Sequence, residues 1–525
     1  MKTENIVACN YVESNGGSFK AINPSLNLPI STPFVAADND IIDSALDKAA
    51  AAFKVFKSIN KDQKSNFLRS IANELELVAT ALIDVAMQES GLTEVRLKGE
   101  LARTTGQLRM FADLIEEGSW VDAVIMPAMP DRLPIPRADI RRMLRPLGPV
   151  VVFGASNFPL AFSVAGGDTA AAFAAGCPVI VKVHPAHPGT SAITATAIIK
   201  AVKNNHLPDG CFSMLYDGSY EVGTALVQHP HTKAVAFTGS LKGGMALHKL
   251  AQNRKDPIPV FAEMGSTNPI FVFPEAVINN AQSLSEKLAV SVTSGAGQFC
   301  TKPGLIFVME NINLDNFKNH LITAFQNSLP VTMLTPGICA NYFEKNAKVL
   351  SENGVSALYA SEIDKSALPN GGNPILAEVT AENWLKNPLL AEEVFGPFSL
   401  LIIIKSIDEL NAIVEKLEGQ LTTTVIAEAE DVAKYCAIIE DLTDKAGRLI
   451  FNGVPTGVEV NAAMNHGGPF PATNNNFTSV GSKSIYRFVR PIAYQDWPDH
   501  LLPMELKREN PYHITRQTNQ TLSKD

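Results

Sequence analysis

The chain has 525 residues, more than one hydrophobic core usually supports, so we expect two or three domains. A net charge of −9 excludes the excess of cations that nucleic-acid binding requires, and 46% hydrophobic with 18% charged residues is the composition of a globular protein. The 6 cysteines form no C-x-x-C pair and the first residues contain no apolar signal segment, which indicates free thiols in a reducing compartment. These features predict a cytoplasmic protein that binds small molecules rather than nucleic acid.

Helical periodicity fills the first part of the chain, from about residue 41 to residue 115. A charged bend with prolines follows at 131–137, and it predicts an extended arm. The stretch from Pro149 to Val183 is apolar enough to resemble a membrane span. It also carries Asn157, Asp168 and several glycines, so we expect it to be buried in protein and predict no membrane partner.

Strands and helices then alternate, which is the pattern of a doubly wound parallel sheet. The predicted strands lie at 150–154, 179–182, 234–239 and 260–263, with helices at 160–176 and 191–204. A second α/β series has strands at 305–308 and 400–404. The tail from 484 to 494 alternates apolar and basic residues like an edge strand, which favours a homo-oligomer.

Two segments carry groups suited to acyl-enzyme chemistry. Cys300 ends the run Gly-Ala-Gly-Gln-Phe-Cys, and Glu263 lies in Phe-Ala-Glu-Met-Gly. A thiol that attacks a carbonyl and a carboxylate that activates water are the two groups such chemistry requires. Each also has a structural explanation, since a cysteine packs as a small hydrophobe and a buried carboxylate can simply be paired.

Two turns follow predicted strands of the first series. Asn157 comes after the first strand, where it caps a turn or donates an N–H to a developing oxyanion. Gly239 and Ser240 lead into a helix that contains Gly244, and helix N-termini attract phosphate. A tight strand-to-helix turn explains the same residues.

Together these segments resemble the aldehyde dehydrogenase superfamily over nearly the whole chain, through Asn157, Lys182, Gly239-Ser240, Glu263, Cys300 and the run from Glu393 to Pro397. The resemblance implies an α/β protein with the aldehyde dehydrogenase fold. A Rossmann-like dinucleotide-binding domain would comprise 1–124 and 148–265, and an α/β catalytic domain 266–475. A β oligomerisation arm and C-terminal tail would comprise 125–147 and 476–525, in a homodimer or homotetramer.

The resemblance also implies roles for single residues. Cys300 would form a thiohemiacetal and then a thioester, Asn157 would stabilise the oxyanion, and Glu263 would activate the water that hydrolyses the thioester. The implied cofactor-binding residues are Lys182 at the adenosine ribose, Gly239, Ser240 and Gly244 at the turn, and Glu393 and Phe395 at the nicotinamide.

The family's glutamate three residues after the ribose-binding lysine is replaced here by Pro185. Without that carboxylate a 2′-phosphate meets no repulsion, so we expect NADP as cofactor with NAD possible. His184 and His187 have the spacing of a metal pair but lack a third ligand, and we expect no metal.

Several stretches resemble the branch that contains 2,5-dioxopentanoate (α-ketoglutarate semialdehyde) dehydrogenases and an NADP-dependent fatty aldehyde dehydrogenase. The first activity is the expected one, and oxidation of an aliphatic aldehyde is the alternative; a non-catalytic binding protein with the same fold is a third. Arg103 is the predicted partner of a substrate carboxylate, and Phe158 and His466 are predicted tunnel-wall residues.

Overall fold

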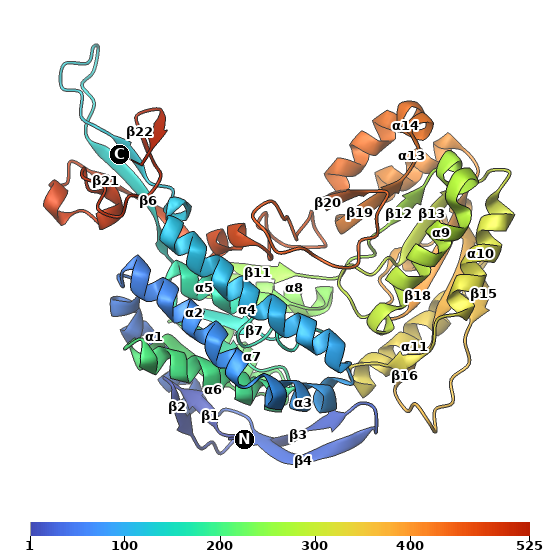
Figure 1. Cartoon of the computed structure of the whole chain (residues 1–525), viewed down its shortest axis with the longest axis horizontal. Helices are drawn as coiled ribbons and strands as arrows, with labels where there is room; N and C mark the ends of the chain where they lie inside the picture. Colours follow the sequence, from blue (N-terminus) through green and yellow to red (C-terminus); the bar gives the residue numbers. More distant parts are fainter. Residues whose placement is uncertain (1, 525) are drawn as a thin grey trace.

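A seven-stranded sheet forms the centre of the first of two α/β units in the computed structural model, which describes residues 2–524 (Figure 1). Its strand order is β11-β10-β7-β8-β9-β1-β2. The strands are β1 Asn5–Val7, β2 Asn10–Val12, β7 Val150–Phe153, β8 Val179–Lys182, β9 Phe212–Leu215, β10 Ala234–Thr238 and β11 Val260–Glu263. From β11 to β9 all neighbours are parallel, as the alternation of strands and helices predicts.

Eight α-helices accompany this sheet among the described residues. They are α1 Asn39–Phe56, α2 Lys61–Leu77, α3 Ala79–Ser90, α4 Glu94–Glu117, α5 Gly167–Ala175, α6 Pro188–Asn204, α7 Glu221–Gln228 and α8 Leu241–Gln252. Within residues 2–524 no helix is long and apolar enough to cross a membrane. The apolar stretch that resembles a span instead forms β7, α5 and β8, all buried.

The order of the strands reverses between β7 and β10, because the chain moves outward from β7 in one direction to β9 and then returns to add β10 and β11. Open α/β sheets bind ligands at the carboxyl ends of the strands next to such a reversal. The turn that follows β7 leads to Asn157, and the turn that follows β10 contains Gly239 and Ser240. The topology thus places these predicted residues at one edge of the sheet.

The second unit is built on another seven-stranded sheet, in the order β15-β17-β18-β13-β12-β19-β20. Its strands are β12 Ile270–Val272, β13 Leu305–Met309, β15 Ser356–Ala360, β17 Ile375–Thr380, β18 Phe398–Ile404, β19 Gln420–Ile426 and β20 Ala446–Phe451. Its helices are α9 Pro274–Thr293, α10 Leu314–Gln326, α11 Pro336–Leu350, α12 Ala381–Lys386, α13 Ile407–Lys416 and α14 Ala429–Asp441. All neighbours are parallel except β15 and β17.

A five-stranded arm projects from the first unit and carries the C-terminus (Figure 1). Its order is β21-β6-β5-β22-β23, with β5 Val124–Met126, β6 Ile140–Pro146, β21 Val489–Gln495, β22 Arg516–Thr518 and β23 Thr521–Ser523. The remaining strands pair as two ribbons, β3 Ser18–Asn23 with β4 Leu28–Val35 and β14 Val331–Thr332 with β16 Gly371–Gly372. Two α/β units and a β arm confirm the predicted fold class.

Two predicted elements differ from the structure. The helix expected at 160–176 begins only at Gly167; before it, the backbone N–H groups of Leu160 and Ala161 donate to the buried Glu100 carboxylate, which holds this segment as a separate turn. The tail is a 3₁₀ segment over Ser482–Phe488 before β21 begins at Val489. There Ile485 and Phe488 are buried three residues apart, which a helical turn allows and a strand does not.

An aromatic cluster ties the helices of the first unit to its sheet. The fully buried ring of Phe173 on α5 lies 6.2 Å from Phe56, 5.1 Å from Phe67 and 6.4 Å from Phe212, between ring centres. We expect Phe173→Ala to lower the free energy of unfolding by about 3–5 kcal/mol, because it leaves a cavity between α1, α2 and β9. Ile312→Ala, at a side chain that is 97% exposed, is the control and should cost less than about 0.5 kcal/mol in the same denaturant titration.

Candidate active site

A strained loop presents Cys300 between α9 and β13. Gly297 has φ +62°, and a Cβ there would lie 2.3 Å from the carbonyl oxygen of Gly396, so only glycine allows this approach. The side-chain amide of Asn268 donates to the backbone oxygen of Cys300 at 2.8 Å and to that of Lys302 at 3.1 Å. The loop is therefore held from both sides, and the thiol has a fixed position.

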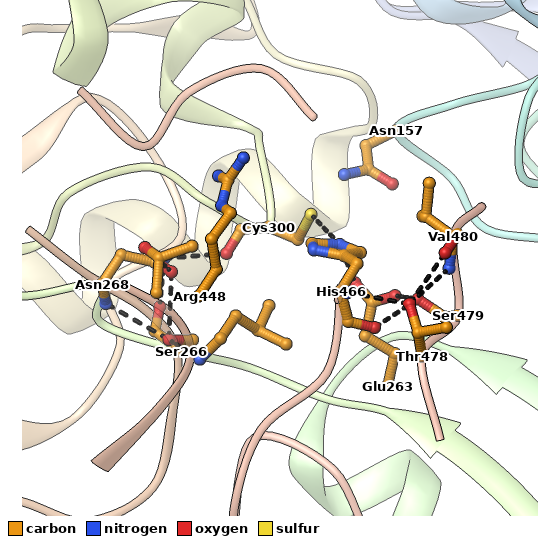
Figure 2. Close-up of polar contacts among 12 residues, drawn as sticks. Asn157, Glu263, Ser266, Asn268, Cys300, Arg448, His466, Thr478, Ser479 and Val480 are labelled. Atoms are coloured by element: carbon orange, nitrogen blue, oxygen red, sulfur yellow. Dashed lines mark hydrogen bonds and ion pairs between the residues drawn. The ribbon is translucent and has the colours of Figure 1, made fainter. Parts of the chain in front are cut away.

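His466 joins the two predicted catalytic groups, as Figure 2 shows. Its Nε2 lies 3.4 Å from the Sγ of Cys300 and 3.0 Å from Oε1 of Glu263. Glu263 ends β11 in the first sheet, whereas Cys300 precedes β13 in the second. One ring nitrogen therefore bridges groups that come from different units.

The segment that carries His466 is anchored to β11. The backbone N–H of Met264 donates to the oxygen of Ala472 at 2.8 Å, and the N–H of Ser479 donates to the oxygen of His466 at 2.8 Å. The Ser479 hydroxyl donates to the second oxygen of Glu263. Both carboxylate oxygens thus face a side chain from this segment.

Burial raises the pKa of the Cys300 thiol well above its ordinary value, and the Glu263 carboxylate raises it further, while Arg103 opposes both. Burial also disfavours ionisation of Glu263, but His466 and Ser479 together bring the pKa of that carboxyl below its ordinary value. The resting site therefore holds a protonated thiol beside a carboxylate. Attack by sulfur therefore requires that the thiol loses its proton as the new bond forms.

Asn157 lies on the loop after β7, and its side-chain amide donates to the backbone oxygen of Gln298 at 3.0 Å, two residues before the thiol. An amide nitrogen carries two hydrogens, so a second N–H is available to a substrate oxygen. The structure thus brings Asn157, Cys300 and Glu263 into one site, as the sequence predicts.

The predicted ribose-binding Lys182 ends β8, and its Nζ lies 3.7 Å from the fully buried carboxylate of Asp217, next to β9. Burial lowers the pKa of Lys182, and Asp217 opposes that shift. At the turn after β10, Ser240 is the N-cap of α8 and accepts from the N–H of Gly243 at 3.2 Å. A Cβ on Gly244 would lie 2.7 Å from the sulfur of Met264, so this glycine lets α8 pack on the strand segment below it.

Glu393 and Phe395 lie on a loop that packs against the cysteine loop and β11. A Cβ on Gly265 would lie 2.3 Å from the carboxylate of Glu393, so that glycine makes room for the carboxylate. The buried ammonium of Lys302 donates to the backbone oxygens of Val394 and Phe398 at 3.0 and 2.9 Å. Burial raises the pKa of Glu393, and the charge of Lys302 opposes it.

The edge of the first sheet fits a dinucleotide. It combines a strand reversal, the first-turn N–H groups of the 12-residue helix α8 and the Lys182 cation, which are groups that attract phosphate and ribose oxygens. The Nε2–H of His187 donates to the backbone oxygen of Ala155 at 2.8 Å, and its ring stacks on His184. That contact ties His187, which follows β8, to the turn after β7 and gives it a structural role.

A cavity of about 350 Å³ opens on Cys300. Its lining includes the predicted residues Arg103, Phe158 and His466 together with the aromatic rings of Phe162 and Phe299. The guanidinium of Arg103 lies 5.3 Å from the ring centre of Phe162 and 5.9 Å from that of Phe158. The structure thus brings together the thiol, an apolar wall and a cation.

The sequence did not single out Arg96, which lines the same cavity, or Ser479, which contacts Glu263. Arg96 could have been found, because residues 96, 100 and 103 fall on one face of a helix. Ser479 lies far along the chain from Glu263, and no local pattern indicates their contact.

Residues 11–480 match the model of the aldehyde dehydrogenase family. The chain belongs to this family. It is 45% identical over 516 residues to α-ketoglutaric semialdehyde dehydrogenase 2 of Azospirillum brasilense, and the match covers 98% of each chain. It is 44% identical to α-ketoglutaric semialdehyde dehydrogenase of Acinetobacter baylyi, over 98% of this chain and 97% of the relative.

Among solved structures, betaine aldehyde dehydrogenase from Staphylococcus aureus in complex with NAD⁺ has the same fold, with a TM-score of 0.80. The match covers 95% of this chain and 96% of that protein at 19% identity. The protein is accordingly an aldehyde dehydrogenase, an enzyme that uses a pyridine nucleotide. In its fold Cys300, Glu263 and His466 lie within contact distance of one another.

The pKa of Cys300 gives a test of this arrangement. Glu263→Gln removes the charge that raises the thiol pKa, so we expect alkylation of Cys300 by iodoacetamide to become faster at pH 7.5. Each unit by which the pKa falls raises the thiolate fraction, and hence the rate, about tenfold while the pH is below the pKa.

The rate is followed on the Cys300 peptide by mass spectrometry across pH, because Cys436 is exposed and also reacts. Glu459→Gln, at an exposed carboxylate of the nearby loop, is the matched control and should leave the profile unchanged. A slower reaction in Glu263→Gln would mean that this carboxylate removes the thiol proton instead of opposing its loss.

Proposed function

We propose that this aldehyde dehydrogenase oxidises α-ketoglutaric semialdehyde (2,5-dioxopentanoate) to 2-oxoglutarate. The observation that carries the proposal is the cavity that joins the Cys300 thiol to an arginine cation across an aromatic wall. This substrate has an aldehyde at one end, a carboxylate at the other and carbon between them. The names of the two relatives at 44% and 45% identity support the same substrate.

Catalysis begins with the sulfur of Cys300, which attacks the aldehyde carbon and loses its proton to water in the cavity. The new oxyanion accepts from the free N–H of Asn157 and from the backbone N–H of Cys300. Glu393 and Phe395 would hold a nicotinamide beside this adduct, and the cofactor would supply the two-electron oxidation that leaves a thioester on Cys300.

Glu263 then accepts a proton from water, which attacks the thioester and releases the carboxylate product. The ring of His466 beside Oε1 and the hydroxyl of Ser479 keep Glu263 ionised for this step. The balance is aldehyde, oxidised nucleotide and water in, and carboxylate, reduced nucleotide and two protons out.

We assign the dinucleotide to the first unit, at 1–124 and 148–265. Lys182 would contact the adenosine ribose, Gly239, Ser240 and Gly244 would form the turn at the phosphates, and Glu393 and Phe395 would contact the nicotinamide half. The catalytic domain would be 266–475. The strand reversal and the N-terminus of α8 support this division.

NADP is the proposed cofactor, with NAD also accepted. Pro185 stands three residues after Lys182, so no carboxylate from that turn faces the ribose 2′ position. Asp217 is fully buried and accepts from the N–H groups of Ser219 and Gly223 at 2.7 and 3.2 Å. Its carboxylate therefore stabilises its own turn and is not exposed to a 2′-phosphate. Burial keeps the pKa of His184 well below its ordinary value, so it adds no second cation.

Pro185→Glu tests this cofactor assignment. A carboxylate at that position should lower the ratio of kcat/KM for NADP to that for NAD by roughly tenfold or more, through repulsion of the 2′-phosphate. Pro185→Ala, which changes the backbone restraint without adding charge, is the control and should keep the ratio. Direct titration of each nucleotide, followed by protein fluorescence, measures the same effect on binding alone.

We further propose a cytoplasmic homodimer or homotetramer. All 6 cysteines are free, which suits a reducing compartment. The bend of the arm exposes Leu133 at 88% and Ile135 at 68%, and the edge strand β20 exposes Leu449 and Phe451. A second copy that covers these side chains would remove apolar surface from water.

Purified enzyme supplied with α-ketoglutaric semialdehyde and NADP tests the activity. We expect reduced nucleotide and 2-oxoglutarate in equal amounts, and Cys300→Ser should lose at least about a thousandfold in rate because the nucleophile is gone. Cys339→Ser is the control at a buried cysteine of the second core. A medium-chain aldehyde in the same assay tests the alternative that the aromatic wall favours, and a higher kcat/KM for it would overturn the proposed substrate.

A further inference from the structure

Three side chains of the kinds that bind transition metals meet beside the cavity. The sulfur of Cys300, a ring nitrogen of His466 and a carboxylate oxygen of Glu263 all lie within 4.8 Å of one another (Figure 2). Within residues 2–524 no other group of three His, Cys, Asp or Glu side chains is arranged to hold a metal ion. Thiolate sulfur, imidazole nitrogen and carboxylate oxygen are the donors that zinc takes in proteins. The cluster therefore has the chemistry of a zinc site.

The distances within the cluster suit a tetrahedral ion. Zinc bonds of about 2.0–2.3 Å at the tetrahedral angle place ligand atoms about 3.4–3.6 Å apart. The sulfur of Cys300 and Nε2 of His466 are 3.4 Å apart, and Nε2 and Oε1 of Glu263 are 3.0 Å apart. A small side-chain rotation is enough to widen the second distance. Cys300 and His466 both line the cavity, so solvent there can take the fourth position.

One ligand atom of the cluster is a buried acceptor without a hydrogen bond. Nε2 of His466 carries at most one hydrogen, and it lies within hydrogen-bond distance of the Cys300 sulfur. Oε1 of Glu263 contacts the ring but accepts no hydrogen bond from the described part of the chain. Glu263 is 3% exposed, so bulk water does not compensate for this. A cation between the three atoms would bond to each of them at once.

Other groups near the cluster weaken the hold on such an ion. Nδ1 of His466 is buried and has no partner among the described residues, whereas a zinc-bound imidazole normally donates its second N–H to a carboxylate or carbonyl. The cations of Arg103 and Arg448 interact with the charge of Cys300 and oppose an added positive charge. These features favour an ion that binds reversibly over one that is a resident part of the enzyme.

We propose that Cys300, Glu263 and His466 form an inhibitory zinc site. The thiol releases its proton to solvent as the zinc–sulfur bond forms, and the carboxylate and the neutral imidazole bind without any change of oxidation state. The bound sulfur no longer attacks a carbonyl carbon, and the bound carboxylate no longer accepts a proton from water. Zinc thus blocks both chemical steps together. Because these groups act on any aldehyde, the inference goes beyond the proposed substrate and does not depend on it.

Zinc chloride added to the chelator-treated enzyme tests the site. We expect one zinc ion per chain by metal analysis, loss of activity at that loading and recovery when EDTA is added. His466→Phe keeps the thiol and the carboxylate. It should raise the zinc concentration for half-inhibition by about a hundredfold or more, because losing a ligand weakens binding more than losing an outer hydrogen-bond partner does. Magnesium chloride at the same concentration should not inhibit, since Mg²⁺ prefers oxygen ligands.

His231→Gln is the matched control for the loss of a histidine. His231 lies on the surface, with Nε2 3.3 Å from Oδ1 of Asp47, so it is where zinc would bind adventitiously. This variant should bind zinc and be inhibited like the wild type. Zinc should also protect Cys300 of the wild type from iodoacetamide, measured on the Cys300 peptide, which needs no variant to fold.

Co²⁺ in place of zinc identifies the ligands without turnover. The wild type should show the near-ultraviolet charge-transfer band of a cobalt–thiolate bond, and Cys300→Ser should not. Glu263→Gln and His466→Phe should keep the band but require more cobalt to reach it, because each lacks one of the other two ligands.

Equal inhibition of the wild type and His466→Phe by zinc would overturn the site, because it would mean that the sulfur binds the ion alone. Cobalt binding without a thiolate band would overturn it as well, and so would loss of the zinc ion in His231→Gln but not in His466→Phe. Each of these results would leave aldehyde oxidation and the proposed substrate intact.

Discussion

The bridge from Cys300 through His466 to Glu263 is the interaction on which the active site depends. A carboxylate at the buried end of β11 is tolerated only if both of its oxygens have partners, and His466 and Ser479 provide them. The same ring nitrogen faces the thiol. The contacts of His466 therefore also fix the distance between the Cys300 thiol and the Glu263 carboxylate.

Charges around the thiol act in opposite directions. Glu263 and Glu393 raise the pKa of Cys300, and Arg103 lowers it. The balance favours the protonated thiol, so the sulfur must lose its proton as it attacks a carbonyl carbon.

Contacts within each unit explain how the loops are held. Asn268 fixes the backbone of the cysteine loop, Lys302 ties that loop to the segment around Glu393, and Gly297 lets it touch Gly396. Glu100 on α4 in turn holds the backbone at Leu160 and Ala161, just after Asn157. The cysteine loop and the loop after Asn157 are therefore held by hydrogen bonds to main chain, which change little with the mobility of side chains.

Local sequence patterns were sufficient to predict much of the fold. The alternation of strands and helices gave the parallel sheet from β7 to β11, since each element has its own hydrophobic period. Cys300, Glu263 and Asn157 stand in short segments that resemble motifs of the aldehyde dehydrogenase family, so they too could be named without coordinates. The start of α5 could not, because the carboxylate that ends the preceding turn comes from residue 100.

Only the tertiary structure decided how these groups meet. His466 was expected at the tunnel wall, and it contacts the thiol and the carboxylate as well, because a segment some 200 residues after β11 folds back on that strand. Arg96 and Glu100 pair locally on α4, whereas Arg103 becomes part of the cavity of Cys300 only when α4 packs beside the Asn157 loop. A sequence records which charges exist, whereas their partners depend on distances between elements that are remote along the chain, and those are fixed only when the two sheets pack together.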